Sequence, residues 1–423
     1  MEKTYKKIAV NISRIILGLV FIFSGFVKAV DPLGGAYKIS DYFSAFNLSY
    51  FHFSAIPLSF FQAAVEFGVG VCLLAGIYRR INSILALLIM LFMTPLTLYL
   101  AIANPVKDCG CFGDAWVISN WQTFYKNIFL LIAAVIVFIW YRYMTSLFSR
   151  KVYFSATIWI YLFIAGVSLY CFYLLPVLDF RPYKIGTNIP EKMNIPENAE
   201  HDKYETILTY MKDGKQKEFT FPNYPDSTWT FVDSKPRLIK KGYEPPIHDF
   251  FITDPEGNDI TEGVLSNPSY GFLLIAYDLS KANDTNAEKI NDIYDFSKLK
   301  GFDFYALTSS LTNDIHDWNE NTGAEYPFCS VDEITLKTII RSNPGLLLIK
   351  NGTVINMWPN TRLPDTEKLA ILTDDTIQKN ASANNIFNTL IILTIILLVP
   401  LIGLFLIDSK IARKYKKRKH NKK

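Results

Sequence analysis

The chain has few of the residues on which common catalytic sites depend. Its 423 residues include only five cysteines and five histidines, and no histidine cluster accompanies the cysteines. No glycine-rich loop precedes a Lys-Ser or Lys-Thr pair, and the segment DPEGNDI, residues 254–260, lacks the acidic spacing of a calcium loop. Serine, calcium-loop and phosphate-loop chemistry therefore have no candidate motif in this sequence.

Hydrophobic residues, by contrast, are abundant. They make up 50% of the chain, aromatic residues make up 15%, and the mean hydropathy is positive. A transmembrane helix needs about 20 predominantly apolar residues. Six segments reach this length, some only with their flanking residues, and we predict that each crosses a membrane: 15–30, 56–77, 83–103, 120–141, 153–178 and 386–407.

Lysine and arginine predict the orientation, because short cytoplasmic flanks carry an excess of them. They gather before the first segment, in the loops at 79–80 and 142–151, and in the tail 408–423. We expect a multi-pass protein of the bacterial inner (cytoplasmic) membrane, with both termini cytoplasmic and residues 179–385 periplasmic. The basic tail is interpreted as an anchor at the membrane end and not as a nucleic-acid site.

Two features of this topology stay open. The first segment is either a retained helix or a signal peptide, although Lys28 near its end and the lack of a small-x-small site argue against cleavage. The loop 31–55 begins with turn residues and continues with aromatic ones. It is either a helix lying at the membrane interface or part of an ordinary aromatic belt.

Cys109 and Cys111 lie in KDCGCFGDA, directly after the third hydrophobic segment and on the predicted outer face. Disulfides persist outside the cytoplasm. A Cys-x-Cys disulfide closes a small ring, and strained, exposed disulfides tend to be the labile or catalytic ones. A redox-active pair, a structural disulfide and a metal site with further ligands remain as interpretations. Cys72 and Cys171 lie inside hydrophobic segments and are expected to be small buried apolar residues.

Residues 1–145 resemble the DoxX/MauE family of four-helix membrane proteins. The resemblance rests on the segments RIILGLVFIFSGFVKAVDPLGG, VEFGVGVCLLAGIYRR and DCGCFGD. It implies a four-helix bundle with an outer cysteine pair, associated with disulfide formation in exported proteins in MauE-type members and with quinone-linked sulfur oxidation in DoxX-type members. The plan is also similar to the DsbB and vitamin K epoxide reductase enzymes. Those use Cys-x-x-Cys and additional cysteines, whereas this bundle has no second outer pair.

Glu66 is the single charge in the segment 56–77 and falls near its middle. An ionisable residue near the bilayer centre is a functional-site hypothesis by default. It would hydrogen-bond a quinone, carry a proton, or pair with a basic group such as Lys28. The alternative is a protonated glutamate hydrogen-bonded within the bundle. Lys28 itself is expected to extend outward from its helix end.

The predicted outer region has two parts. Residues 179–246 form a β-rich segment with a hairpin turn at Asp213–Gly214. From 247 to 385, strands alternate with helices, which predicts an α/β sheet. This part resembles the thioredoxin fold, particularly its TlpA-like and peroxiredoxin-like branch, with Asn343–Pro344 at the place of the cis-proline loop that contacts partners.

The cysteines that the thioredoxin resemblance would require are missing. The redox Cys-x-x-Cys should follow GFLLIAYDL, but the sequence there is SKANDTNAEK. We therefore expect a binding or docking version of the fold. Cys329, the remaining cysteine, is either a small buried residue or a single resolving thiol that reaches Cys109 or Cys111 through a mixed disulfide.

The whole arrangement resembles the large DoxX-family proteins typical of Bacteroidetes, a resemblance that implies no settled activity. The membrane-side cysteine pair with Glu66 favours one function, and the missing thioredoxin motif favours another. In the first, Cys109 and Cys111 exchange thiol and disulfide equivalents with an exported thiol-containing or membrane protein, and a quinone near Glu66 accepts the electrons. In the second, the chain is a non-catalytic scaffold or assembly subunit whose thioredoxin-like domain binds a periplasmic partner. The sequence leaves the oligomeric state open.

Overall fold

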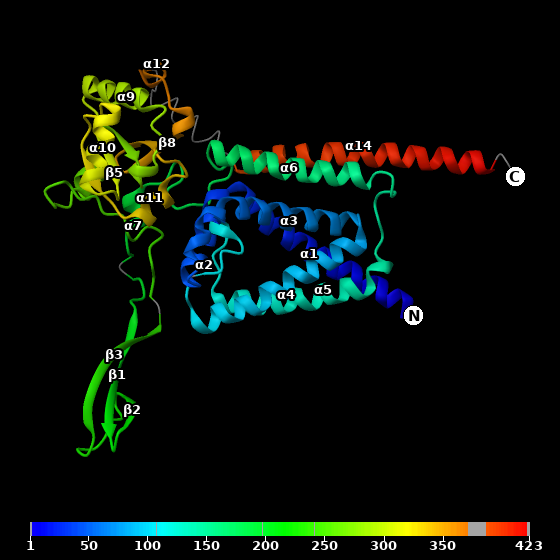
Figure 1. The fold of residues 1–423 in the computed structure, drawn as a ribbon, viewed down its shortest axis with the longest axis horizontal. Helices are drawn as coiled ribbons and strands as arrows, with labels where there is room; N and C mark the ends of the chain where they lie inside the picture. Colours follow the sequence, from blue (N-terminus) through cyan, green and yellow to red (C-terminus); the bar gives the residue numbers. More distant parts are fainter. Residues whose placement is uncertain (1, 107, 197, 241, 371–385, 421–423) are drawn as a thin grey trace.

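The computed structural model describes residues 2–106, 108–196, 198–240, 242–370 and 386–420. A group of long helices runs side by side, a mixed sheet domain covers one end of them, and a slender β-sheet projects from that domain (Figure 1). The last part of the predicted outer region, residues 371–385, and the final residues of the basic tail, 421–423, lie outside the described residues.

All six predicted membrane segments are helical, and each helix is long and apolar enough to cross a membrane. Four of the helices differ from the predicted spans by more than two residues: α1 and α4 begin earlier, the fifth helix ends at Tyr173 and not at residue 178, and the sixth continues beyond residue 407. The added ends of α1, α4 and α14 carry charged residues, so hydropathy alone could not place them, whereas Pro176 follows the end of the fifth helix within an apolar run. The helices are α1 (Glu2–Val30), α3 (Ala55–Ala75), α4 (Arg79–Ala103), α5 (Asn120–Trp140), α6 (Tyr153–Tyr173) and α14 (Ile386–His420).

The loop after α1 contains a further helix, α2 (Pro32–Ala45), followed by the 3-10 helix η1 (Ser49–Ser54). Asp31 caps α2, since its carboxylate accepts a hydrogen bond from the Gly34 amide at 2.9 Å. Pro32 stands at the first helical position, where its missing N–H costs nothing. Of the two interpretations of this loop, the helix is therefore the one that forms.

Helices α1, α3, α4 and α5 make a four-helix bundle, with α6 packed against α3 and α14 against α6. Small residues let α1 and α3 approach closely. A side chain at Gly70 would place its Cβ 2.8 Å from the Gly18 carbonyl oxygen. Glycine pairs of this kind are typical of helix contacts within membranes, where dispersion and close backbone approach replace the hydrophobic effect.

The sheet domain, residues 247–370, is built on a five-stranded sheet of order β6-β5-β4-β7-β8. Strands β4, β5 and β6 are parallel, whereas β7 and β8 form an antiparallel hairpin whose turn is Asn351–Gly352. The β4-α9-β5 crossover followed by the β7-β8 hairpin confirms the predicted thioredoxin-like fold. The strands are β4 (Tyr270–Ile275), β5 (Asp303–Thr308), β6 (Phe328–Ser330), β7 (Gly345–Lys350) and β8 (Thr353–Pro359).

Helices cover both faces of this sheet. Leu336 and Ile339 of α11 (Glu333–Ile339) pack on one face, together with α8 (Thr261–Ser266). Ile290 of α9 (Ala287–Lys300) and Trp318 of α10 (Thr312–Thr322) pack on the other. The nearly continuous apolar run of β4 is explained by this burial on both sides.

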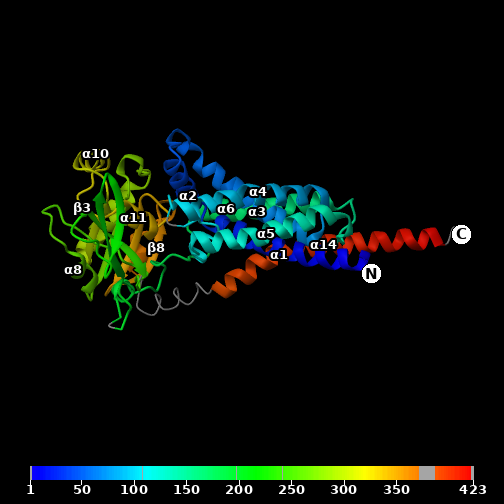
Figure 2. The ribbon, with the colours of Figure 1, turned by 90° about the horizontal axis from the view of Figure 1, so that it is seen from below.

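The β-arm is an antiparallel sheet of order β2-β1-β3, made of β1 (Lys203–Lys212), β2 (Lys215–Thr220) and β3 (Thr230–Lys240). Asp213 and Gly214 both have positive φ, at 51° and 73°, which is the turn that the Asp-Gly pair predicted. The arm extends away from the helices (Figure 1), and both termini lie toward the end of the helices opposite the sheet domain (Figures 1 and 2).

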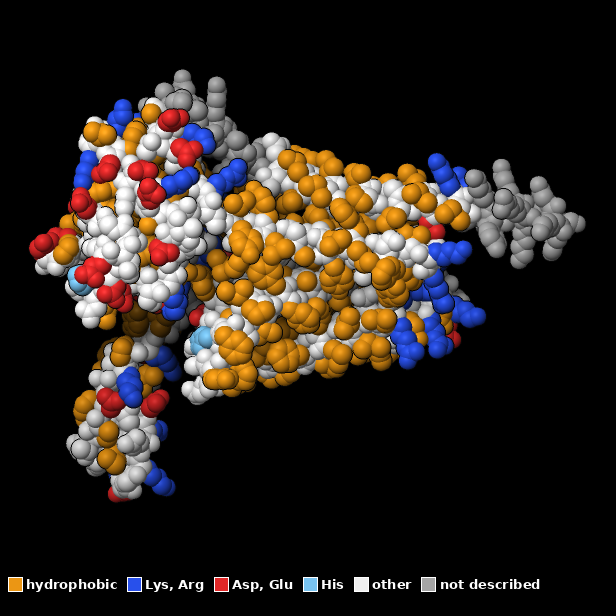
Figure 3. All heavy atoms as spheres, turned by 45° about the horizontal axis from the view of Figure 1, so that its top comes forward, with side chains coloured by type: hydrophobic (Ala, Val, Ile, Leu, Met, Phe, Trp, Pro, Cys, Tyr) orange, Lys and Arg blue, Asp and Glu red, His pale blue; other side chains and the backbone are white. Residues whose placement is uncertain are grey.

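Charge divides the molecule in the same way. Hydrophobic side chains cover the flanks of the helices, lysines and arginines gather at the end that holds both termini, and acidic side chains lie mainly on the sheet domain (Figure 3). A broad apolar flank between polar ends is what a lipid bilayer requires of a spanning bundle.

Candidate functional site

The cysteine pair lies in the Cys loop, the segment between α4 and α5. The Sγ atoms of Cys109 and Cys111 are 2.8 Å apart. Both residues are buried, at 6% and 8% exposure, in a cluster with Leu100 and Val106. The pair is enclosed because the Cys loop folds down onto the bundle and does not extend from it.

Local geometry explains how the loop turns between the two cysteines. Gly110 has a φ of +64°, in the left-handed region that favours glycine. Its amide donates to the Asp108 carboxylate at 2.8 Å, and Asp108 also pairs with Lys38 of α2 at 3.1 Å. The Tyr42 hydroxyl, also from α2, donates to the Cys109 carbonyl at 2.7 Å. Helix α2 thus holds the loop in place from one side.

A buried polar network holds the loop from below. Lys28 of α1 pairs with Glu66 of α3, with 2.7 Å between Nζ and Oε2, and donates to the Cys111 carbonyl at 3.0 Å. The Ser24 hydroxyl lies 2.7 Å from both Glu66 Oε2 and the Cys111 carbonyl, and its single proton can serve one of them at a time. Gln62 donates to the other Glu66 oxygen at 2.9 Å.

This network corrects one prediction and selects among others. Lys28 does not extend outward, since it is 8% exposed and its ammonium points into the bundle. Burying an ammonium without a partner is costly, so Glu66 explains its position. Of the roles considered for Glu66, pairing with Lys28 is the one that the structure contains, and the Cys111 carbonyl joins that pair.

Electrostatics separate the two thiols. The thiol of Cys109 donates toward Cys111, which is the main reason why the pKa of Cys111 is lowered to about 7 despite its burial. The positive charges of Lys126 and Lys28 act in the same direction. The hydrogen bond to Cys111 and burial together raise the pKa of Cys109. In the reduced state Cys111 is therefore the more acidic thiol of the pair.

A cavity of about 610 Å³ opens beside the pair, between α2, α3 and α4. Most of its wall is aromatic or aliphatic, with Phe43, Phe61 and Phe92 among the lining residues. Its polar groups are those already described: Cys109, Cys111, Glu66, Lys28, Lys38, Gln62 and Tyr42 all line it. Phe61 and Phe92 are 67% exposed in the absence of lipid, so this wall borders the apolar flank of the bundle.

The sheet domain covers the Cys loop from the other side. Arg341 donates to both oxygens of Asp31, at 2.8 to 3.0 Å, and lies 3.2 Å from Asp114 of the Cys loop. Arg341 is almost fully buried in this arrangement. We call the contacts of Arg341 with Asp31 and Asp114 the arginine clamp.

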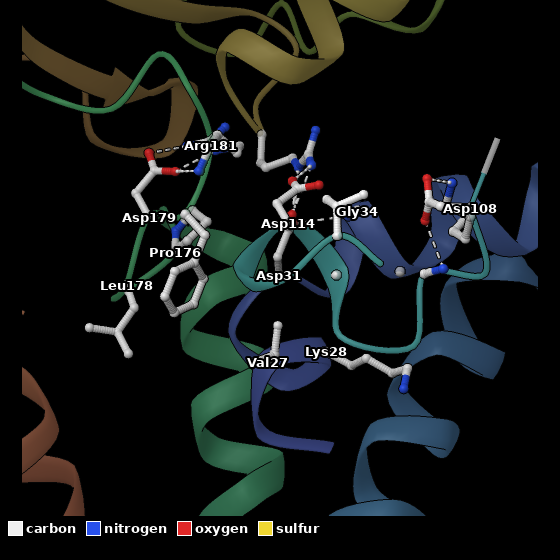
Figure 4. A pocket seen from close by; sticks show the side chains of 17 residues that line it. Val27, Lys28, Asp31, Gly34, Asp108, Asp114, Pro176, Leu178, Asp179 and Arg181 are labelled. Carbon is white, nitrogen blue, oxygen red and sulfur yellow. Dashed lines mark hydrogen bonds and ion pairs between the residues drawn. The ribbon is translucent and has the colours of Figure 1, made fainter. Parts of the chain in front are cut away.

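Further contacts surround the arginine clamp. The Tyr277 hydroxyl, just beyond β4, lies 3.1 Å from the Tyr37 hydroxyl of α2. A small cavity of about 90 Å³ remains between the Cys loop and the segment 176–181, which enters the sheet domain. Asp31 and Asp114 face this space from the bundle, and Arg181 pairs with Asp179 across from them (Figure 4).

The predicted cis-proline loop belongs to this covering edge. The Asn343–Pro344 peptide is cis, and the Asn343 side chain donates to the Asp278 carbonyl at 2.7 Å. Tyr277 and Arg341 lie next to these residues in the chain and contact the bundle. The edge that carries a Cys-x-x-Cys in redox-active thioredoxins therefore faces the Cys loop here.

Cys329 is not brought to the pair. It lies in β6, 3% exposed, among core residues of the sheet domain such as Leu336, whereas Cys109 and Cys111 belong to a separate cluster. Burial raises its pKa to about 11, which disfavours the thiolate. Cys72 and Cys171 are buried between helices, as expected.

Several residues of the site carried no signal in the sequence. Ser24, Gln62, Tyr42 and Arg341 are ordinary residues in their segments, and only packing brings them to the loop. Lys126 at the start of α5 had a weak signal, as a charge inside an apolar segment; its ammonium lies 4.1 Å from the centre of the Phe112 ring.

Two family models match this chain, one in the membrane bundle and one in the β-arm. Residues 6–140 match the family model of methylamine utilisation protein MauE, and residues 204–241 match a domain of unknown function, DUF8463. The search of curated proteins found no match.

Two solved structures are similar to part of the chain. One is a "putative protein disulfide isomerase" from Bacteroides thetaiotaomicron, with 18% identity over 31% of this chain and 82% of that chain and a TM-score of 0.24. The other is StoA from Bacillus subtilis, with 14% identity over 28% and 92% of the two chains and a TM-score of 0.23. The fold assignment of the sheet domain rests on its own strand order. The membrane bundle is similar to methylamine utilisation protein MauE over residues 6–140, which confirms the resemblance expected from its DCGCFGD element.

Proposed function

We propose that this protein is a membrane thiol–disulfide oxidoreductase in which Cys109 and Cys111 cycle between dithiol and disulfide. One observation carries the proposal: two sulfur atoms 2.8 Å apart stand between a lipid-facing cavity and a covered outer face. The hydrogen bond from Cys109 and the positive charges of Lys126 and Lys28 lower the pKa of Cys111, which favours the thiolate that disulfide exchange needs.

The outer half-reaction exchanges a disulfide with an exported dithiol. A thiolate of the exported protein attacks one sulfur of the Cys109–Cys111 disulfide and forms a mixed disulfide with it. Cys111 is the better leaving group because of its lower pKa, so attack on Cys109 is favoured. The second thiol of the exported protein then releases Cys109, leaving an oxidised client and a reduced Cys pair.

Closing the Cys pair again releases two electrons and two protons, and the acceptor must be supplied. The cavity fits a quinone, because its wall is aromatic and its polar groups are confined to the end that holds the cysteines. A bound quinone would supply the two-electron, two-proton acceptor. Gln62, Tyr42 and the Lys28–Glu66 pair would hold its polar end, and Glu66 and Lys28 are placed to exchange protons near Cys111.

The same proposal includes an orientation. The end with both termini would be cytoplasmic, and the sheet domain with the Cys loop would be periplasmic, in a bacterial inner membrane. The gathering of arginine and lysine at the terminal end supports this orientation (Figure 3). An exported protein would then approach the Cys loop from the side of the sheet domain.

A non-catalytic scaffold remains the second candidate, and one observation favours it. The sheet domain has no cysteine near its cis-proline loop and uses that edge to cover the Cys loop. A structural disulfide beneath a docking domain would have the same appearance. The two functions differ in whether the redox state of the pair changes during growth.

Thiol trapping in intact cells distinguishes them. Cells are acid-quenched and alkylated with a mass tag, and the Cys109/Cys111 peptide is followed as the respiratory quinone supply is varied. We expect a mixture of oxidised and reduced pair that becomes more reduced when quinone is depleted. The Cys111→Ser variant should accumulate a mixed disulfide through Cys109, which would identify the client.

Cys72→Ser is the matched control, since it removes a buried cysteine of α3 and should leave the pattern unchanged. A pair that is fully oxidised, or fully reduced, at every quinone level contradicts electron transfer and favours the scaffold.

A further inference from the structure

A second large cavity lies at the other end of the helices, where both termini are. It has a volume of about 620 Å³ and is formed by the turn between α3 and α4 and by the connection between α5 and α6. Four arginines and three tyrosines make up most of its wall: Arg79, Arg80, Arg142, Arg150, Tyr78, Tyr141 and Tyr153. Neither the cysteine chemistry nor the MauE resemblance assigns it a role.

The wall of this basic cavity contains no acidic residue among the described residues. Arg79 donates to the Met144 carbonyl, and Arg142 donates to the Tyr141 hydroxyl at 3.3 Å. Asp408 of α14 lies in this region, but its carboxylate accepts hydrogen bonds from the amide and hydroxyl of Ser149. The cavity therefore holds an excess of guanidinium groups, which suit the planar, bidentate recognition of phosphate.

An apolar groove continues from the basic cavity along α6. Tyr78 lines both, and the groove of about 440 Å³ is lined further by Phe154, Thr157, Ile158, Tyr161, Leu162 and Ala165. These α6 positions recur every three or four residues, so they form one face of the helix. The site thus combines a cationic head and an apolar tail on the flank that faces lipid.

We propose that this composite site binds one anionic glycerophospholipid, with its phosphate among the arginines and an acyl chain along α6. Basic pockets between membrane helices are suited to anionic headgroups. Arginines placed only to set the topology would need neither a shared cavity nor a groove continuing from it. A free phosphate would use the arginines and leave the groove unused, so the groove points to the lipid.

Lipid titration of the purified full-length protein in detergent, followed by native mass spectrometry, tests the proposal. Phosphatidylglycerol is compared with phosphatidylcholine, which has the same chains and no net charge. We expect phosphatidylglycerol to bind at least fivefold more tightly. The Arg80→Gln/Arg150→Gln variant should weaken it by about 25-fold, from roughly fivefold per arginine near an anionic headgroup.

The Lys3→Gln/Lys7→Gln variant removes two charges from the same end and leaves the cavity intact, so it should bind phosphatidylglycerol as the unmodified protein does. The Ala165→Trp variant fills the groove and should weaken phosphatidylglycerol independently of charge. The Ala165→Trp variant keeps the proposal testable if the arginine variant does not fold.

Three outcomes would overturn the proposal. Equal affinity for phosphatidylglycerol and phosphatidylcholine would mean that the arginines do not select an anionic headgroup. An equal loss of phosphatidylglycerol affinity in the Lys3→Gln/Lys7→Gln control would mean that binding depends on net charge and not on the cavity. Displacement of phosphatidylglycerol by millimolar glycerol 3-phosphate would make free phosphate the ligand.

Discussion

Replacing Arg341 by methionine should uncover the Cys loop. The substitution keeps an apolar stem and removes the guanidinium of the arginine clamp. Asp31 and Asp114 would lose their shared partner, and the sheet domain would lose its charged contact with the bundle. An exported thiol would then reach the Cys pair more often.

The structure sets the magnitude. Arg341 and Asp31 are 7% and 20% exposed at their side chains, so removing one partner of this pair costs about 3 kcal/mol or more. Asp114 is 45% exposed, and its contact with Arg341 contributes less than about 1 kcal/mol. A shift of about 3 kcal/mol in the docking equilibrium corresponds to an increase on the order of 100-fold in the uncovered population.

The assay is the alkylation rate of the reduced Cys pair in membrane vesicles, measured by mass spectrometry of its peptide. Arg341→Met should raise that rate by up to about 100-fold. Arg341→Lys keeps the charge but loses the bidentate contact with Asp31, so its alkylation rate should lie between those of the unmodified protein and Arg341→Met. Arg362→Met, which removes an exposed arginine of the same domain, should leave the rate unchanged.

The pH dependence follows from Asp31. Burial by itself raises the pKa of this carboxyl, but the charge and hydrogen bonds of Arg341 outweigh it, so the net pKa lies below the usual value. The clamp therefore contributes fully above the ordinary aspartate pKa and is lost only as the pH falls through the lowered one. If Arg341→Met and Arg362→Met give the same alkylation rate at neutral pH, the clamp does not control access and the reasoning fails.

Three further predictions concern the loop and its support. The alkylation rate of Cys111 in the reduced protein should reach half its maximum near pH 7, and Lys126→Gln should move the midpoint upward; a midpoint of 9 would contradict the lowered pKa of Cys111. Glu66→Gln should lower the stability by about 3 kcal/mol because it leaves the buried ammonium of Lys28 without its charged partner. Replacing both Lys28 and Glu66 by methionine should recover most of the loss, and equal melting temperatures for Glu66→Gln and the unmodified protein would refute this. Gly110→Ala should destabilise the loop by about 1–2 kcal/mol, since its φ is +64°, and should speed proteolysis there; an unchanged digestion rate would argue against the strain.

Some of the site could be predicted because its signals are local. The hydropathy of each segment marks the helices, and the Asp213–Gly214 and Asn351–Gly352 pairs mark turns that the backbone requires. The closely spaced cysteines of the Cys-Gly-Cys motif and the single charge in α3 could be read directly from the sequence. Each of these signals depends on a few neighbouring residues, so it can be read without knowledge of the fold.

The direction of Lys28 and the partner of Arg341 could not be predicted in that way. A lysine near a helix end usually extends toward water, and here it turns inward because α3 presents Glu66 at the same level. Asp31 and Arg341 stand 310 positions apart, and no periodicity links them. The covering of the Cys loop depends on how the sheet domain docks.

The sequence by itself determined six apolar helices, a thioredoxin-like alternation of strands and helices, and a cysteine pair at the end of a span. Those features follow from composition and short-range pattern, which act through burial and backbone propensity. Only the tertiary structure decided that the pair is buried, that Lys28 and Glu66 support it, and that an arginine clamp covers it. Ion pairs and cavities depend on which surfaces meet, and that is set by the packing of the whole chain.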